Sequence, residues 1–334
     1  MTKKSIIPII IAVIVIAAAG GAGAFFALRS GSTTEASASS ESEKDTSTSP
    51  SAVYEELPAT ISYNGKTYTK NRDISTILFL GVDTEEKAEI DGSDIGYMGC
   101  ADTDIIFILN KAEKTIQILE LPRDTMVGVD VYNSDHEIVF TKLAQLALQY
   151  SSSDSASRSC RLMKNKISEL LYNIQIDDYL SMTMNGIVAA VDAMGGITLT
   201  FDQDFSDVNE AYTEGATVTL NGTEVEAFVR HRSHTSSDAS VGRMNQQSWF
   251  IRQLFSQIAA GKVGITTLYN AAADYIETDL YVDDLKTFAD YELLSEKYTI
   301  PGEYKAGDEY SEFYADDDGI YDMVINLFYI PTEE

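Results

Sequence analysis

An uncharged stretch near the beginning of the chain limits what the whole protein can become. Residues Ser5 to Leu28 contain no charged side chain and are mostly aliphatic or small. At about 1.5 Å per residue, a helix of this run would be about 36 Å long, enough to cross a ~30 Å hydrocarbon core. Lys3 and Lys4 precede the run, so the positive-inside rule places residues 1–4 in the cytoplasm. We therefore expect residues 5–28 to form a transmembrane signal anchor.

A cleaved signal peptide is the alternative interpretation of this run. Ala22-Gly23-Ala24 is a small-residue stretch of the kind found at cleavage sites, although the apolar core of a signal peptide is normally only ~7–15 residues long. Residues 29–58 are rich in Ser, Thr, Glu and Ala and lack apolar periodicity, which predicts a flexible extracytoplasmic linker. The folded domain is then expected over residues 59–334, outside the cytoplasm of a single-pass cell-membrane protein.

The charge balance excludes several kinds of partner. The chain has 24 Lys and Arg against 52 Asp and Glu, a formal net charge of −28. This argues against nucleic acid and against anionic lipid headgroups as partners, because both need a basic face. Residues 302–334 form an especially acidic extension. Only two cysteines are present, so Cys100 and Cys160 either form one disulfide or remain two buried thiols.

Strand-like and helix-like patterns alternate from residue 60 onward. Nearly continuous apolar runs predict strands covered on both faces, at Ser75–Val82, Asp104–Leu109, Thr115–Leu121 and Tyr179–Met184. Apolar residues at helical spacing predict helices, at Ser157–Tyr172, Ile187–Met194 and Gly242–Ala260. This alternation predicts an α/β fold, in which a mixed central sheet is flanked by helices as an α-β-α sandwich.

Shorter signals complete the expected fold. The pair Asn64-Gly65 predicts a small hairpin across Ile61–Tyr68. A second pair, Asn221-Gly222, predicts a turn beside the strand Thr217–Leu220. The Tyr, Phe and Ile content of Tyr321–Ile330 predicts a final packed helix or strand rather than a free tail.

Arginines in short motifs carry the first chemical signal. The chain has only nine arginines. Arg123 directly follows a predicted strand, where open sheets place ligands. Arg230 and Arg232 are two residues apart and share one face if that segment is extended, and Gly242-Arg243 follows them. Guanidinium groups bind phosphate through a planar fork of donors, so convergence of these arginines would suit a pyrophosphate. The alternative is that each pairs with a surface carboxylate.

Three carboxylates lie at predicted strand ends. Asp83 ends the first buried strand, while Asp102 and Asp104 lie at the start of the next. Together with substrate phosphates, such oxygen ligands could hold Mg²⁺. The alternative is that they are ordinary solvated residues at strand ends.

Taken in chain order, these motifs resemble those of the LytR-CpsA-Psr family. The segments that carry the resemblance are Ile77–Asp83, Ala101-Asp102-Thr103, Leu121–Thr125, Val191–Ile197, Leu220–Arg232 and Gly242-Arg243 with Gln247. They cover residues 74–260, and their order, spacing and single N-terminal anchor match the family. Four positions depart from the family pattern: Cys100, Ala144, Gln246 and Ser248 stand where Arg, Asn, Arg and Gln are usual.

The resemblance implies a phosphotransferase that moves a glycopolymer from a polyprenyl pyrophosphate carrier to a hydroxyl of cell-wall peptidoglycan. The polymer would be teichoic acid, capsule or a related wall glycan. Carried over by position, the metal ligands for Mg²⁺ (or Mn²⁺) are Asp83 and Asp102, with Asp104 as an additional candidate. The implied pyrophosphate contacts are Arg123, Lys142, Arg230, Arg232, Arg243 and Gln247.

The expected mechanism is an in-line attack of the acceptor hydroxyl on the polymer-linked phosphorus. The arginines and the metal neutralise the charge that develops on the leaving group. A carboxylate accepts the hydroxyl proton, so the candidate catalytic residues are Arg123, Asp124 and Asp83. Two alternatives stay open: a non-catalytic polyprenyl-phosphate-binding regulator of envelope assembly, and a pyrophosphate hydrolase that uses the same residues with water as acceptor.

Overall fold

The computed structural model describes most of the chain after residue 56. The described residues are 57–87, 95–96, 98–231, 246–247, 249–250, 253–254, 257, 263–281, 284, 291–307 and 310–332. The expected anchor at 5–28 lies outside them, as does nearly all of the expected linker. Within the described part of the chain, no helix has the length and apolar content needed to cross a membrane.

A six-stranded mixed sheet forms the centre of the domain. Its strand order is β11-β8-β3-β4-β5-β12. β4 lies antiparallel between β3 and β5, whereas β8 runs parallel to β3, β12 runs parallel to β5 and β11 closes the edge antiparallel to β8. The bounds are β3 Ile74–Val82, β4 Ala101–Asn110, β5 Thr115–Leu121, β8 Asp178–Met182, β11 Ile276–Thr278 and β12 Glu292–Thr299.

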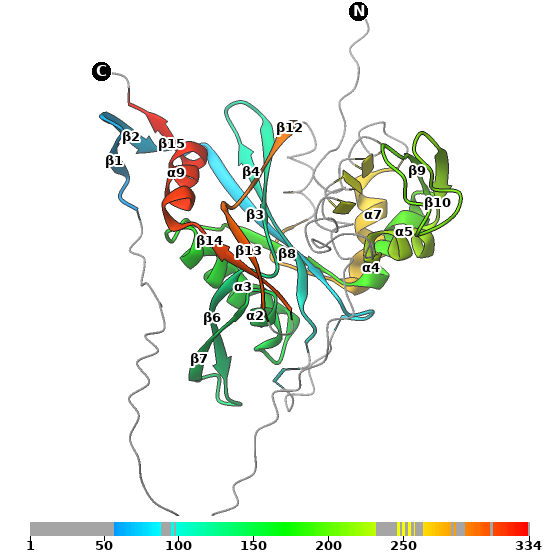
Figure 1. Cartoon of the computed structure of the whole chain (residues 1–334), viewed down its shortest axis with the longest axis horizontal. Coiled ribbons are helices and arrows are strands. Elements are labelled where there is room, and N and C mark those ends of the chain that lie inside the picture. Colours follow the sequence, from blue (N-terminus) through cyan, green and yellow to red (C-terminus); the bar gives the residue numbers. More distant parts are fainter. Residues whose placement is uncertain are drawn as a thin grey trace, which may run out of the picture.

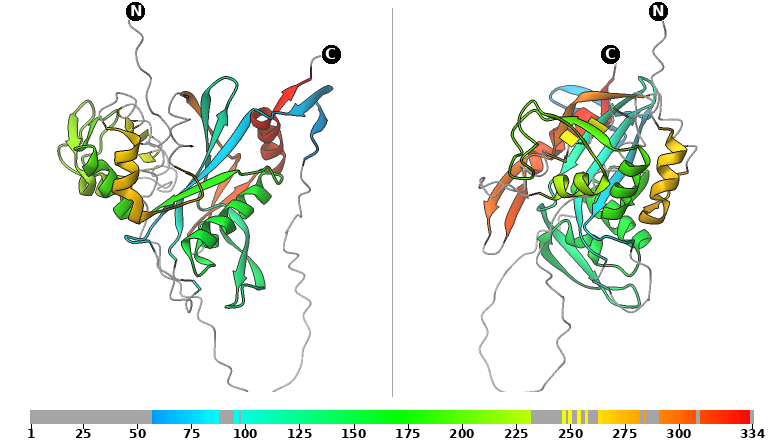
Figure 2. Two further views of the ribbon diagram at one scale, coloured as in Figure 1. Left: turned by 180° about the vertical axis from the view of Figure 1, so that it is seen from behind. Right: turned by 90° about the vertical axis from the view of Figure 1, so that its right-hand side faces the viewer.

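Helices cover both faces of this sheet, as expected for an α-β-α sandwich (Figures 1 and 2). Alternate residues of a strand point to opposite faces, and β4 shows why its apolar run is continuous. Ile105 and Phe107 belong to the core under α4, α5 and α7, while Ile106 and Ile108 belong to the core under α3 and α9. The helices are α2 Leu148–Ser151, α3 Ala156–Leu170, α4 Met184–Ala193, α5 Gly222–Arg230, α7 Ile265–Ala272, η1 Ala273–Tyr275 and α9 Asp317–Phe328.

In the described part of the chain, four small sheets lie around the central one. The Asn64-Gly65 hairpin forms as predicted, with φ values of 49° and 74° that suit an Asn-Gly turn. The strand that follows α9 adds to this hairpin as a third strand, so the predicted final packed element is confirmed. The bounds are β1 Thr60–Tyr63, β2 Lys66–Lys70 and β15 Tyr329–Pro331; β6 Met126–Tyr132 and β7 Ile138–Gln145; β9 Ile197–Thr200 and β10 Thr217–Leu220; β13 Gly302–Ala306 and β14 Ser311–Ala315.

The second Asn-Gly pair, Asn221-Gly222, begins a helix, so the prediction of a turn is wrong. Asn221 is the N-cap of α5: its side-chain oxygen accepts the Glu224 N–H at 3.0 Å, and the Glu224 carboxylate accepts the Asn221 N–H at 2.8 Å. This reciprocal capping box starts a helix. Arg230 therefore lies in the last turn of α5 rather than on an extended segment, and the expectation that it shares a strand face with Arg232 does not hold.

Gly222, the first residue of α5, is required by close packing. An added Cβ would lie 2.4 Å from the carbonyl oxygen of Val188 in α4. The two helices thus approach each other at backbone distance. The predicted helix at 242–260 is described only at some of its positions, and each of these is helical.

Candidate functional site

The topology brings three strand ends to one edge of the sheet. β3 ends where β4 begins, and β5 ends beside the start of β4, because β4 runs antiparallel to both. Asp83 directly follows β3, Asp102 is the second residue of β4 and Arg123 follows β5 by two positions. The Asp83 backbone N–H donates to the Cys100 carbonyl at 3.1 Å, and its side-chain Oδ1 accepts the Cys100 N–H at 2.7 Å. Three of the predicted site residues, Asp83, Asp102 and Arg123, therefore meet at this edge.

Arg123 is fixed by buried acids rather than by surface ones. Its Nη1 forms an ion pair with Asp102 Oδ1, and its Nε lies 3.5 Å from Asp124 Oδ1. The Asp102 side chain is fully buried, and only 11% of the Arg123 side chain is exposed. The surface-pairing alternative therefore fails for this residue. An arginine so held has a defined orientation with little side-chain entropy left to lose when it binds a ligand.

Gln145 was missed by the sequence reasoning, although it follows Lys142 by only three residues. Its Nε2 donates to Asp124 Oδ1 at 2.8 Å and to the carbonyl oxygen of Ser311 at 2.9 Å. The Phe313 N–H donates to the Asp124 carbonyl at 2.9 Å. Arg123 lies in the turn Pro122–Thr125, called here the arginine turn. Strand β14 of the acidic C-terminal extension thus forms one side of this turn. This gives the extension a structural role that its sequence did not suggest.

Two arginines act electrostatically on Asp83. Burial raises the pKa of Asp83, while the Cys100 N–H and the positive charges of Arg123 and Arg230 oppose that rise. Arg230 also pairs with Glu226, one turn earlier on α5, at 2.7 Å. Its side chain remains 35% exposed. Arg230 therefore lies near enough to Asp83 to oppose the rise of its pKa, while one carboxylate already shares its charge.

Two glutamines at described helical positions, Gln246 and Gln247, bond to α5 and to the sheet. Thr103 Oγ1 donates to Gln247 Oε1 at 3.1 Å, which places Gln247 beside the start of β4. Gln246 Nε2 donates to the carbonyl oxygen of Phe228 at 2.5 Å. Both glutamines are buried. Gln246, where the family pattern has Arg, thus satisfies a backbone carbonyl of α5.

Asp104 lies deeper in the sheet than the other acids. It pairs in register with Leu80 and Leu121 and is only 2% exposed. Neither carboxyl oxygen has a hydrogen-bond partner among the described residues. Burial alone raises the pKa of Asp104 well above its ordinary value. A carboxyl in this setting favours its neutral form.

The remaining predicted residues are placed only in part. Lys142 lies on β7, opposite Val129 of β6, in the hairpin that projects below the sheet in Figure 1. Arg232 and Arg243 lie outside the described residues, so their predicted convergence is not tested. No group of three or more His, Cys, Asp or Glu side chains in the described ranges is arranged to hold a metal ion.

The two cysteines are free thiols. Burial raises the pKa of Cys100 to about 11 and that of Cys160 to about 12. Both groups are therefore neutral near pH 7, and the disulfide alternative is not the one that the structure adopts.

Comparison with known proteins gives a consistent result. The sequence matches the model of the LytR_cpsA_psr family over residues 25–324. A Halalkalibacterium halodurans protein, named polyisoprenyl-teichoic acid–peptidoglycan teichoic acid transferase TagU, is 26% identical over 218 residues, with 64% of each chain covered. Its namesake from Oceanobacillus iheyensis is 27% identical over 221 residues, covering 65% of this chain and 62% of the relative. This chain therefore spans less than two thirds of either relative.

A solved structure shows the same fold. The crystal structure of TagU from Bacillus subtilis aligns with a TM-score of 0.52 over 77% of this chain and 96% of that one. The sequences are 21% identical over the alignment. This likeness concerns the arrangement of the sheet and its helices.

Proposed function

The chain belongs to the LytR-CpsA-Psr family, and we propose on this basis that it transfers a glycopolymer from a polyprenyl pyrophosphate carrier to a peptidoglycan hydroxyl. The names of its relatives as teichoic acid transferases support teichoic acid or a similar wall glycan as the polymer. The observation that carries the proposal is Arg123, held by buried acids at the strand edge that also carries Asp83.

The proposed pyrophosphate contacts are cationic groups around this edge. Arg123 and Arg230 present guanidinium donors to phosphate oxygens and neutralise charge on the leaving group. Gln247 adds a polar contact beside β4. Arg232, Arg243 and Lys142 complete the proposed set by their positions in the family motifs.

Asp83 is the proposed general base. Its raised pKa brings it closer to the working pH, where proton transfer is most effective. Asp124 instead accepts a hydrogen bond from Gln145 and lies next to Arg123 Nε, so we propose that it positions the arginine. The acceptor hydroxyl loses its proton to Asp83 as its oxygen attacks the polymer-linked phosphorus, and the carrier leaves as lipid phosphate.

The carboxylates at the strand edge fit Mg²⁺ as a proposed cofactor. Asp102 is an oxygen donor that already pairs with Arg123, and Mg²⁺ is usually bound through one or two carboxylates plus substrate phosphates. Asp83 is the second oxygen donor on a neighbouring strand end, and it would hold the ion only in place of its role as the base. When bound, the ion would neutralise pyrophosphate charge. Asp104 fits this role poorly, because its burial favours a protonated carboxyl.

We further propose that the protein is a single-pass membrane protein with its domain outside the cytoplasm. The uncharged run at 5–28 supports this, as does the carrier itself, whose polyprenyl chain is retained in a membrane.

A transfer assay tests the proposal. The full chain in non-ionic detergent is given a labelled saccharide on polyprenyl pyrophosphate, together with peptidoglycan and Mg²⁺. Label should move to peptidoglycan, and Arg123→Gln should abolish transfer. Arg161→Gln, which removes an exposed arginine of α3 that contacts only Ser157 among the residues described, is the matched control and should transfer normally.

The products separate this proposal from its alternatives. Release of labelled saccharide phosphate into water would indicate a hydrolase instead. Carrier binding that depends on Arg123, without turnover in either direction, would indicate a non-catalytic regulator.

A further inference from the structure

A pocket of about 350 Å³ lies at the opposite end of β3 from the site described above. Ile74, the first residue of β3, lines it, whereas Asp83 follows the last. Eight residue steps at about 3.3 Å separate the two ends of the strand by about 26 Å. The pocket is thus a separate place on the molecule, within the size range of small-ligand sites.

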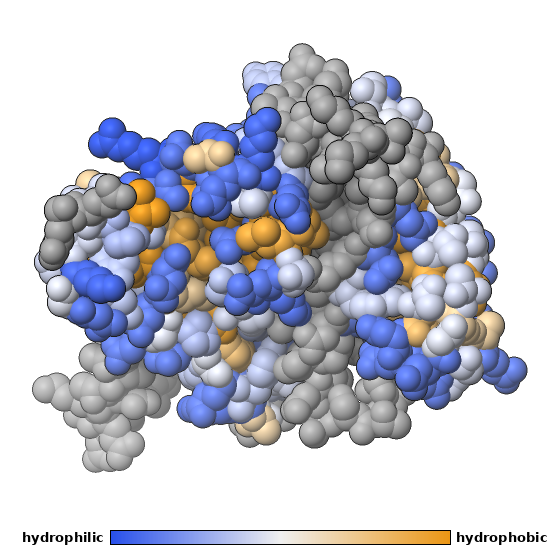
Figure 3. All heavy atoms as spheres, turned by 90° about the horizontal axis from the view of Figure 1, so that it is seen from above, coloured by the Kyte–Doolittle hydropathy of each residue, from blue (hydrophilic) through white to orange (hydrophobic). Residues whose placement is uncertain are grey.

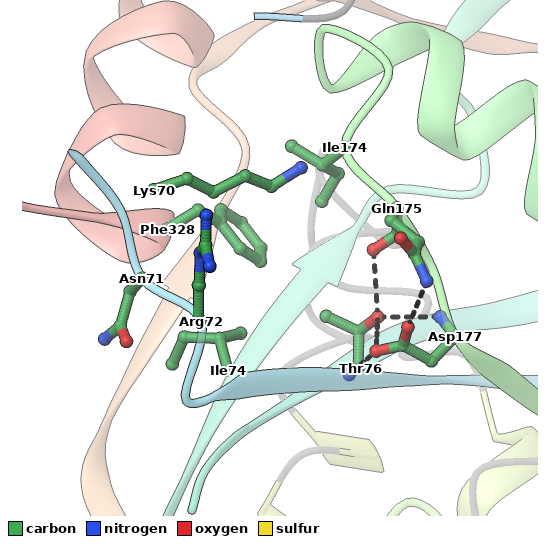
Figure 4. Close-up of a pocket in the computed structure, with 9 residues that line it drawn as sticks. All are labelled: Lys70, Asn71, Arg72, Ile74, Thr76, Ile174, Gln175, Asp177 and Phe328. Carbon is green, nitrogen blue, oxygen red and sulfur yellow. Dashed lines mark hydrogen bonds between the residues drawn. The ribbon is translucent and has the colours of Figure 1, made fainter. Parts of the chain in front are cut away.

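Two cationic side chains line this pocket. Lys70 ends β2, and Arg72 is an exposed residue of the turn that leads into β3. Figure 4 shows both side chains lying beside Phe328 on one side of the pocket, with Gln175 and Asp177 on the other. No carboxylate among the described residues is paired with Arg72. These two cations lie in a chain of net charge −28, and they favour an anionic ligand over a cationic one.

The one acid among the lining residues, Asp177, is hydrogen-bonded to neutral groups. Asp177 Oδ2 accepts the Thr76 N–H at 2.9 Å and the Thr76 hydroxyl at 3.4 Å. Its Oδ1 accepts the side-chain N–H of Gln175 at 2.6 Å. Because these three donors are neutral, the carboxylate is solvated by the protein itself. The lining therefore has a net charge of about +1 from its ionised groups.

The floor of the pocket is apolar. Ile174 and Phe328 are only 3% and 4% exposed, and Ile74 lies beside them. Figure 3, which looks at the molecule from above, shows patches of apolar surface among hydrophilic groups on that face. A few convergent charged groups over an apolar base suit a small ligand with one anionic group and a body that has C–H surface.

We infer that this pocket binds a phosphate group carried on a sugar-sized or polyol-sized body. Arg72 and Lys70 contact the phosphate oxygens, and the body packs on Ile174 and Phe328. Two sources share this chemistry: a free sugar or polyol phosphate, and a repeating unit of an anionic glycopolymer. The polymer source rests on the proposed function, since a chain held at the pyrophosphate site would then have a second contact about 26 Å away along β3.

Calorimetric titration of the full chain in non-ionic detergent tests this inference. The probes are glycerol 3-phosphate, glycerol as its uncharged counterpart, and a purified poly(glycerol phosphate). We expect the first to bind and glycerol not to bind. Arg72→Gln and Lys70→Gln should each weaken binding about tenfold or more, while Arg72→Lys should retain part of it. Arg161→Gln should bind as the native chain does.

The effects of the variants on probe binding show which site holds the phosphate and which source it comes from. Loss of binding in Arg72→Gln but not in Arg123→Gln assigns the phosphate to this pocket, even if transfer activity is never found. Loss only in Arg123→Gln, or no binding by the native chain at millimolar probe, overturns the inference. Tighter binding of the polymer than of the monomer, with both sensitive to Arg72, identifies the polymer as the source; equal affinity per phosphate identifies the free phosphate.

Discussion

Replacing Asp104 by leucine should stabilise the domain, which is unusual for a change in the middle of a sheet. Leucine has the same branching as aspartate, and the residues opposite it on β3 and β5 are leucines already. The native carboxyl is buried, and neither oxygen has a hydrogen-bond partner in the part of the chain that the structure describes. Burying a polar group in this way costs about 1–3 kcal/mol. Asp104→Leu should therefore raise the free energy of unfolding by about that amount at pH 4.

The gain should grow with pH. The unfolded chain loses the Asp104 proton near pH 3.9, whereas the folded chain keeps it because burial raises the pKa. Between these two pKa values the folded state binds more protons, so the native protein loses about 1.4 kcal/mol of stability per pH unit as pH rises. The leucine variant has no such loss. Asp178, whose pKa burial and neighbouring acids raise to about 6, affects both proteins equally and cancels in the difference.

Urea unfolding at pH 4, 5 and 6 measures this difference. Asp104→Asn is the matched control: it removes the ionisation but keeps an unpaired polar group, so it should remove the pH dependence with a smaller gain at pH 4. A leucine variant less stable than the native chain, or a gain that does not change with pH, would refute the reasoning. Mg²⁺ that stabilises the native chain but not Asp104→Leu would show instead that Asp104 is a metal ligand.

Further changes test other parts of the structure. Gln145→Leu removes both hydrogen bonds of a buried amide and should lower the free energy of unfolding by about 2 kcal/mol in urea titration; no change would mean that the arginine turn is held by other contacts. Cys100 and Cys160 have raised pKa values and should resist iodoacetamide in the folded protein at pH 8. After unfolding, mass spectrometry should find two alkylated thiols; an unalkylated, oxidised pair would contradict the structure. Gly222→Ala should lower the melting temperature by several degrees. Gly264→Ala should lower it less, because an added Cβ meets open space there and only the N-cap preference of α7 is lost.

The sheet was predictable from the sequence because its central strands are buried on both faces. The run Thr115–Leu121 was placed with its bounds intact, and the β3 prediction misses only Ile74. The prediction of a turn at Asn221-Gly222 was wrong because an Asn-Gly pair can begin either a turn or a helix. Glu224, three residues after Asn221, was the available signal for a capping box.

Parts of the site were not predictable because they depend on distant contacts. Gln145 acts through Ser311, which lies 166 residues later in the chain, and no local pattern reports such a pair. The alternation of side chains along β4 places Asp104 on the opposite face from Thr103 and Ile105. It does not predict how deeply that face is buried. Arg123 was identified by its place after a strand, whereas its pairing with buried rather than surface acids depended on the neighbouring strand end.

The contact between β14 and the arginine turn also sets an order of events during synthesis. The turn that carries Arg123 is synthesised early. The carbonyl oxygen of Ser311 accepts a hydrogen bond from Gln145, yet Ser311 follows Gln145 by 166 positions. At about 5–20 residues per second, the ribosome needs roughly ten to thirty seconds to supply it. A nascent or truncated chain that lacks β14 therefore has its arginine but not the strand beside it. The turn is completed only when the C-terminal segment has arrived.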